Sequence, residues 1–198
     1  LGTTTEVEDP YPSDLEQIFE VRVDPHYARN GSWYEIFPRS QGTIPNQSAT
    51  WHDVVDRIED IKYMGFDTLY LTPIHPIGLT KRKGPNNSLI AQPHDPGCPY
   101  AIGNTEEGGH YSLEPQLGTE ADFDHFVKVY KENGFKLALD VALNCSPDHP
   151  HVHDHPEWFY HEADGSIQCA INPPKRYEDV YPYNYVNENY EELWEDVR

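Results

Sequence analysis

The stretch GTEADFDHFVKVYKENGFKLALDVAL, residues 118–143, predicts a helix that leads directly into a strand. Thr119 is placed to cap the helix, and Gly134 supplies the left-handed residue that ends it. Apolar side chains recur at helical spacing at Phe123, Phe126, Val127 and Tyr130. The continuous apolar run FKLALDVAL then predicts a buried strand.

The same order occurs earlier in the chain. Apolar side chains recur at helical spacing in residues 51–64, which predicts one amphipathic helix with Ser48 or Thr50 as its cap. Gly65 would end this helix, and FDTLYLTP, residues 66–73, would form the next strand. The repeated order indicates a common building unit.

A short buried strand is also predicted at SWYEIFP, residues 32–38. Strand, helix, glycine and strand in this order are typical of parallel β/α units, so the fold class is α/β. A complete TIM (β/α)8 barrel has eight units and typically about 250 residues, so we expect about three units, the N-terminal portion of such a barrel. NENYEELWEDVR, residues 187–198, predicts a further helix marked by Tyr190, Leu193 and Val197.

The chain is expected to divide near residue 30. Residues 1–30 mix charges and prolines and are interpreted as a lead-in or the end of a preceding module, and residues 31–198 as the partial barrel. A loop insertion, residues 73–118, is predicted after the second strand, and a small inserted domain, residues 144–187, after the third. Connections this long are usually functional or disordered, and both leave the end of the barrel that carries active sites.

The charge excludes some classes of partner. Asp and Glu number 34 against 14 Lys and Arg, so the net charge of −20 would repel nucleic acid and anionic membranes. The acidic excess fits either an ordinary solvated surface or adaptation to high salt. No apolar run approaches the roughly 20 residues of a membrane span. The 3 cysteines lack a CxxC spacing, which favours a cytoplasmic location.

Several motifs resemble the α-amylase superfamily, glycoside hydrolase family 13. GGHYSLEPQLGTEADFDHFV resembles the segment that opens the helix before its third strand, and LALDVALNCSPDHP resembles its first signature, normally Asp, three residues, Asn and His. Asp140 and Asn144 occupy the first two signature positions, whereas Cys145 replaces the His. In the family this His contacts the sugar whose bond is cleaved, so the resemblance places Cys145 in the sugar pocket. The resemblance implies double displacement with net retention and no metal or organic cofactor.

Further segments resemble one branch of this superfamily, bacterial maltosyltransferases that transfer maltose from maltose 1-phosphate to an α-1,4-glucan. In chain order these segments are SWYEIFPRS, MGFDTLYLTPIHPIG, TKRKGPNN, HDPGCPYAIG, CSPDHP, HPEWF and NPPKRYEDVYP. The resemblance covers about residues 31–190. It implies maltose 1-phosphate and α-1,4-glucan as partners, with a homodimer as a further expectation. A trehalose synthase or amylase type of enzyme, and a non-catalytic glucan-binding fragment, are the alternatives.

The resemblance assigns the sugar side of the substrate site to four residues. Lys83 and Asn87 would hold maltosyl hydroxyls, and Tyr100 would stack on the sugar ring. Asn144 stands where the branch has Gln, which gives a shorter amide contact. Without the resemblance, a solvated lysine, a turn asparagine and a packed tyrosine would be the preferred interpretations of the first three.

The phosphate side is assigned to NPPKRY. Asn172, Lys175 and Tyr177 would offer an amide, a cation and a phenol to the donor phosphate. Asp140 would support the site by hydrogen bonding, although a role in tying strand to loop is equally open. The nucleophile and general acid are expected beyond Arg198, so this chain alone should be inactive.

The stretch PDHPHVHDHPEW contains four alternating histidines, His149, His151, His153 and His155. Histidines two apart project to one side of a strand and could ligate zinc. Pro147, Pro150 and Pro156 interrupt any regular strand, however, so no metal site is predicted.

Overall fold

The computed structural model describes residues 21–198, and the chain separates into two compact units, residues 1–30 and 31–198. The described part of the first unit contains the 3-10 turn η1, His26–Ala28. Most of the predicted lead-in lies outside the described residues. No described helix combines the length and the apolar composition that crossing a membrane requires.

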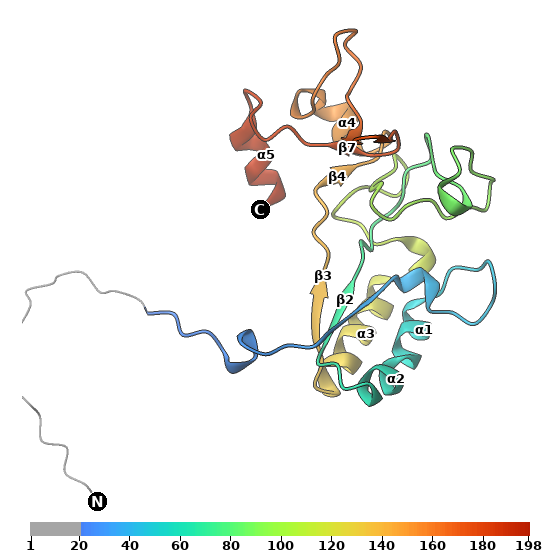
Figure 1. Ribbon diagram of the computed structural model, residues 1–198, viewed down its shortest axis with the longest axis vertical. Helices are drawn as coiled ribbons and strands as arrows, with labels where there is room; N and C mark the ends of the chain where they lie inside the picture. Colours follow the sequence, from blue (N-terminus) through green and yellow to red (C-terminus); the bar gives the residue numbers. More distant parts are fainter. Residues whose placement is uncertain (1–20) are drawn as a thin grey trace, which may run out of the picture. The chain divides into compact units, whose positions relative to one another are not determined.

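Three parallel strands form the sheet of the second unit, in the order β1–β2–β3 (Figure 1). They are β1 Trp33–Ile36, β2 Thr68–Leu71 and β3 Lys136–Leu139. The strands are in register, so all three end at the same carboxyl edge. The three predicted strands and their parallel pairing are confirmed.

The helix before β3 has the predicted ends. α3, Glu120–Glu132, begins after Thr119, whose N–H donates to Asp122 Oδ2 at 2.8 Å and whose hydroxyl accepts from the Asp122 N–H at 3.3 Å. This reciprocal pair satisfies N–H groups that a helix start leaves free. Gly134 follows the helix with φ of +83°.

The prediction of a single helix over residues 51–64 is wrong at one position. Two helices, α1 Trp51–Asp56 and α2 Ile58–Tyr63, are separated by Arg57. The Arg57 N–H bonds to the carbonyl of Val54, three residues back, so the backbone tightens into a turn there. Thr50, rather than Ser48, is the cap.

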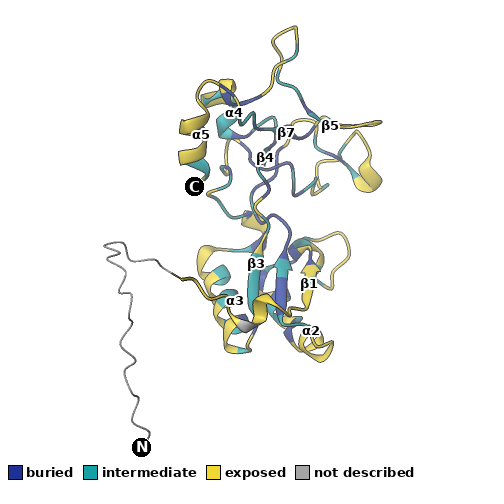
Figure 2. Ribbon diagram, turned by 60° about the vertical axis from the view of Figure 1, so that its left-hand side comes forward, coloured by how far each residue is buried: buried dark blue, intermediate teal, exposed yellow. Residues whose placement is uncertain are grey.

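Helices α1, α2 and α3 pack against the sheet in one apolar core. Trp51 stacks on Phe126 with ring centroids 5.1 Å apart, and the Tyr130 hydroxyl donates to the Val54 carbonyl at 2.8 Å. Figure 2 shows buried residues along the central strand β2, intermediate residues along β3, and exposed residues on β1 and on the outer sides of the helices. The apolar side chains that recur at helical spacing in the sequence therefore face this sheet core.

Beyond the carboxyl edge, the chain forms long connections with short elements. The 3-10 turns are η2 Pro38–Ser40, η3 Pro85–Asn87, η4 Pro115–Leu117 and η5 Pro156–Trp158. Two antiparallel pairs and a short helix follow β3: β4 Asn144–Cys145 with β7 Tyr181–Pro182, β5 Ala170–Asn172 with β6 Lys175–Tyr177, and α4 Pro150–Asp154.

The helix predicted near the C-terminus is α5, Tyr190–Val197. Its Leu193 enters a second apolar core together with Cys145, Trp158 and Tyr183, whereas Tyr190 is 45% exposed and is not the core position that the spacing predicted. α5 therefore packs on the connections and contributes nothing to the sheet core. Figure 1 shows it near α4.

Candidate substrate site

One cavity of about 530 Å³ collects most of the predicted substrate residues. Its lining includes Lys83, Asn87, Tyr100, Asn144 and Tyr177. These side chains come from three places: the connection after β2, the short strand β4 and the hairpin strand β6. Residues far apart in the sequence thus meet beyond the carboxyl edge of the sheet, where a β/α fold places its site.

Lys83 is positioned by its neighbour Arg82. The Arg82 guanidinium donates to three backbone carbonyls: Gly78 at 2.7 Å, Ile77 at 2.8 Å and Asp95 at 3.2 Å. A planar fork with five donors suits such a multiple contact. The Lys83 side chain is only 8% exposed, so the arginine holds the loop while the lysine lines the cavity.

Asn87 lies in the turn η3 and is exposed. Asn86 and Asn87 both have positive φ, 56° and 62°. Asparagine adopts this left-handed conformation more readily than most residues do. The turn residues of RKGPNN therefore shape the loop, and the second asparagine also reaches the cavity lining.

Asp140 follows β3 and is held by two phenols. The Tyr100 hydroxyl donates to Asp140 Oδ2 at 2.9 Å, and Tyr70 of β2 also bonds to this carboxylate. The bond to Asp140 raises the pKa of Tyr70 to about 12, and burial followed by the same carboxylate raises the pKa of Tyr100. Sequence reasoning missed Tyr70, although it pairs with Ala138, which shares a strand face with Asp140.

Two of the predicted phosphate residues lie outside the cavity lining. Asn172 and Lys175 are exposed and face each other across the β5–β6 hairpin, whereas Tyr177 is half-buried and lines the cavity. Directly opposed residues share one face of an antiparallel pair, and residues two apart in a strand share a face. The three side chains therefore project from the same face of the hairpin, with only the phenol at the cavity wall.

The long connections are tied to each other by polar contacts. The Asp148 carboxylate accepts from the Leu79 N–H at 2.7 Å, the Thr80 N–H at 2.6 Å and the Thr80 hydroxyl at 2.5 Å. The Ser146 hydroxyl donates to the Gly103 carbonyl at 2.5 Å. These bonds fix the loop before Lys83 to the segment that follows Asn144.

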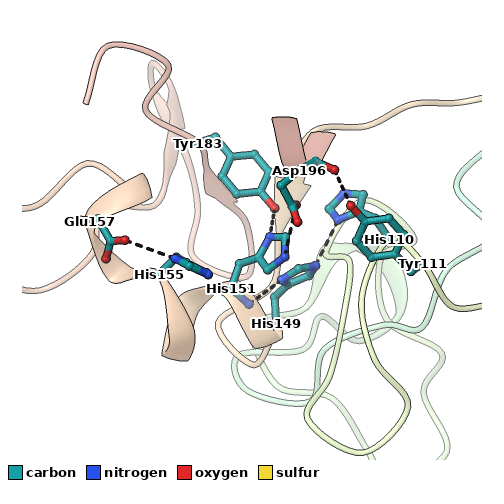
Figure 3. A network of polar contacts seen from close by, with 8 residues as sticks. All are labelled: His110, Tyr111, His149, His151, His155, Glu157, Tyr183 and Asp196. Carbon is teal, nitrogen blue, oxygen red and sulfur yellow. Dashed lines mark hydrogen bonds and ion pairs between the residues drawn. The ribbon is translucent and has the colours of Figure 1, made fainter. Parts of the chain in front are cut away.

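The histidine-rich stretch forms the helix α4, and part of it belongs to a buried relay (Figure 3). The His151 N–H donates to His149 Nδ1 at 3.0 Å, so the proton of His149 sits on Nε2 and donates to His110 Nδ1 at 3.0 Å. His110 Nε2 then donates to the Ala142 carbonyl at 2.9 Å. Burial, with like charges nearby, lowers the pKa of His149 to about 2, so the relay is neutral.

This relay does not fit a metal ion. Ligand atoms of His110, Cys145 and His149 lie within 4.8 Å of one another. A metal on His149 Nε2 would move the ring proton to Nδ1, where the His151 N–H already donates. Burial also raises the pKa of the Cys145 thiol and disfavours the thiolate that metals bind.

The ring of His149 is enclosed by two glycines. A Cβ at Gly103 would lie 2.4 Å from its ring, and a Cβ at Gly109 would lie 2.2 Å from it. His149 is itself only 2% exposed. The second glycine of GGHYSLEP, Gly109, and the glycine of YAIG, Gly103, therefore make room for this imidazole.

Cys145 occupies the position where the superfamily signature has a histidine, but it does not line the cavity. It is fully buried in the second core, against Trp158 and Tyr183. The expectation that this position belongs to the sugar pocket is wrong for this chain. The reason is that β4 turns Cys145 into the aromatic core while neighbouring Asn144 lines the cavity.

Comparisons with known proteins agree with this geometry. Residues 35–196 match the family model described as alpha amylase, catalytic domain. The chain is 50% identical over 176 residues to the alpha-1,4-glucan:maltose-1-phosphate maltosyltransferase of Picrophilus torridus, covering 89% of this chain and 27% of that protein. It is 55% identical over 160 residues to maltosyltransferase 2 of the same description from Streptomyces coelicolor, covering 81% and 24%.

Among solved structures, an alpha-amylase from Lactobacillus plantarum is similar, with a TM-score of 0.66 and 34% sequence identity. The match covers 85% of this chain and 34% of that one. The chain thus spans about a quarter of the length of the curated relatives and about a third of the amylase chain.

Proposed function

Because this chain belongs to the family of α-amylase catalytic domains and has a TIM-barrel type of fold, we propose that it is part of a retaining glycosyltransferase. The enzyme would move maltosyl units from maltose 1-phosphate to the non-reducing end of α-1,4-glucans. The observation that carries this proposal is the cavity lined by Lys83, Asn87, Tyr100, Asn144 and Tyr177. The relatives at about 50% identity are named alpha-1,4-glucan:maltose-1-phosphate maltosyltransferases, which supports the same reaction.

The finer architecture belongs to the same proposal. β1, β2 and β3 would be the first three of eight barrel strands, with residues 73–118 and 144–187 as insertions that build the substrate site. The shared carboxyl edge of the strands supports this reading. A cytoplasmic location and a homodimer remain predictions.

In this enzyme Asp140 would orient neighbouring groups of the site and would not act as the nucleophile. Retaining transfer needs a nucleophilic carboxylate and a carboxylic acid about 5–5.5 Å apart. The Asp140 carboxylate is occupied by the Tyr100 and Tyr70 phenols, which suits a group that orients a sugar-stacking tyrosine. The nucleophile and acid would then come from residues outside this sequence, and no metal or organic cofactor takes part.

Asn172, Lys175 and Tyr177 would receive the phosphate of the donor. Their common face on the β5–β6 hairpin supports this assignment, since an amide, a cation and a phenol can then converge on one anion. Lys83, Asn87 and Asn144 would hold the maltosyl hydroxyls inside the cavity. The donor would lie with its sugar in the cavity and its phosphate toward the hairpin.

The test uses the full-length protein with maltose 1-phosphate and a short malto-oligosaccharide. Release of inorganic phosphate together with elongation by one maltosyl unit, and α-configured products by NMR, is the expected result. Replacing the donor by maltose is the control and should abolish elongation. Hydrolysis of the glucan without a need for donor would favour an amylase type of enzyme, and glucan binding without either reaction would favour a binding fragment.

A further inference from the structure

A second cavity, of about 930 Å³, adjoins the substrate cavity and has no role in the proposed reaction. Lys83, Gly84 and Gly97 line both cavities. The second cavity extends from them to the loop after β1, residues 39–48, and to residues 93–96. Among its described lining residues, none belongs to the β5–β6 hairpin that would receive the donor phosphate. Its volume is that of a small-molecule site.

The lining of the second cavity carries an excess of positive charge. Arg39, Arg82 and Lys83 are its cations. Among the described lining residues Asp95 is the one carboxylate, and its Oδ2 already accepts from the Gln92 N–H at 2.6 Å. In a chain with 34 acidic and 14 basic residues, this local reversal of charge indicates an anionic ligand.

Two guanidinium groups are held close together at one wall. Arg39 Nη1 donates to the Pro96 carbonyl at 2.9 Å, and Arg82 Nη1 donates to the carbonyl of Asp95, one residue earlier, at 3.2 Å. Burial lowers the pKa of Arg39; the Glu114 carboxylate opposes this, and the charge of Arg82 adds to it. Yet within residues 21–198 no ion pair of 4.0 Å or less joins Arg39 to any carboxylate.

Arg39 therefore keeps donors for a ligand. A guanidinium has five N–H donors, and no described acceptor other than the Pro96 carbonyl bonds to this one. A phosphate group accepts paired, charge-assisted bonds from a guanidinium, and its charge offsets the repulsion between two neighbouring cations. Amide and hydroxyl side chains of the same lining suit the hydroxyls of an attached sugar: Ser40, Asn46, Gln47 and Gln116.

We propose that the second cavity is a phosphate site separate from the hairpin, in which Arg39 binds the phosphate group and Arg82 contributes charge. The group has two sources, free inorganic phosphate and a sugar phosphate. The volume and the polar lining favour the sugar phosphate. This site goes beyond the proposed maltosyl transfer, because Arg39 and Arg82 do not line the substrate cavity.

The test measures binding of glucose 6-phosphate, inorganic phosphate and glucose to the full-length protein by calorimetry. Lys175→Ala is the background, because it removes the cation assigned to the donor phosphate. In this background Arg39→Gln should weaken glucose 6-phosphate about tenfold and leave glucose unchanged. Arg57→Gln is the matched control and should change neither ligand by more than about twofold, since Arg57 is also half-buried but lines neither cavity.

If Arg39→Gln does not fold, Asn46→Asp in the same background decides. This change adds a negative charge to the cavity lining at almost constant size, and it should weaken glucose 6-phosphate about fivefold. Asn86→Asp is its control and should have less than about a twofold effect. Both asparagines are exposed with positive φ, 61° and 56°, but Asn86 lines neither cavity.

The three ligands distinguish the sources of the phosphate group. Tighter Arg39-dependent binding of glucose 6-phosphate than of inorganic phosphate identifies a sugar phosphate, and the reverse order identifies the free ion. The inference is overturned if Lys175→Ala alone leaves no phosphate binding, if folded Arg39→Gln retains it in full, or if Asn46→Asp acts no more than Asn86→Asp. Failure of the proposed function is separable, because it is measured as absent maltosyl transfer by the unmodified protein.

Discussion

In the sheet core the buried side chains are mostly apolar, whereas the loop region, residues 73–118 and 140–198, also buries ionisable and polar groups. Lys83, Ser146, His149 and Asp179 are all buried there. The sheet core is stabilised by close packing and by the burial of apolar surface. In the loop region, the contacts that fix the backbone are donor–acceptor pairs such as Asp148 with residues 79–80. The two regions should therefore respond differently to the same kind of substitution.

The largest effect is expected in the sheet core. Phe126 is fully buried between helices and sheet, so Phe126→Ala should reduce the free energy of unfolding of the full-length protein by about 3–5 kcal/mol. Denaturant unfolding would measure this loss. Tyr63→Ala, at an exposed position of α2, is the control and should cost less than about 1 kcal/mol. Equal losses would mean that the sheet core is not the main source of stability.

A large effect on binding, with little effect on stability, is expected at Lys175. Lys175→Ala should weaken maltose 1-phosphate by about 1.5–3 kcal/mol, roughly ten- to a hundredfold, and leave maltose unchanged. Arg176→Ala is the matched control, since the next residue of a strand projects to the opposite face. Calorimetry with both ligands provides the measurement. Equal losses for maltose and maltose 1-phosphate would remove Lys175 from the phosphate site.

Two cysteines of the loop region, Cys145 in the second apolar core and Cys98 in the cavity lining, allow a direct comparison. Cys145→His enlarges a fully buried side chain and should cost about 1–3 kcal/mol of stability, with a lower melting temperature but little change in maltose affinity of the folded protein. Cys98→His places the same ring in the cavity lining and should do the reverse. If Cys145→His reduces sugar affinity without loss of stability, position 145 belongs to the sugar pocket after all.

The smallest effect concerns acid pH and the histidine relay. The folded pKa of His149, about 2, lies below its ordinary value of about 6.5, so the unfolded chain binds more protons between these limits. Stability from the neutral relay is thus present above pH 6.5 and declines as the pH falls, by up to about 1.4 kcal/mol per unit. Unfolding at pH 7 and pH 5 should show a smaller difference in His149→Asn, which keeps a capping acceptor without titrating. An identical pH dependence would contradict this role.

The sheet layer was predictable because its signals are local. The Thr119 cap, the apolar spacing of α3 and the Gly134 stop lie within one short stretch, and each is present in the structure. The break at Arg57 was not predictable from spacing, since the apolar pattern continues through it.

The site was predictable only where residue identity carried the information. Resemblance identified Lys83, Tyr100 and Tyr177, which line one cavity. Tyr70 was missed because its role arises from a contact between segments that are distant in sequence. Cys145 was misplaced because its surroundings come from Trp158 and Tyr183, which no local pattern around position 145 reveals.

Because Gly109 lies so close to the His149 ring, the effect of a substitution at position 109 depends on the residue at position 149. Gly109 does not have a positive φ, so the obstacle to alanine there is the imidazole, 2.2 Å from where the new carbon would be. The cost of Gly109→Ala therefore depends on the residue at position 149: it is severe beside histidine and small beside serine, which leaves the space empty. Gly103 differs, because its φ of +95° penalises a side chain whatever stands opposite. In a double-mutant library, positions 109 and 149 should co-vary, while position 103 should remain glycine.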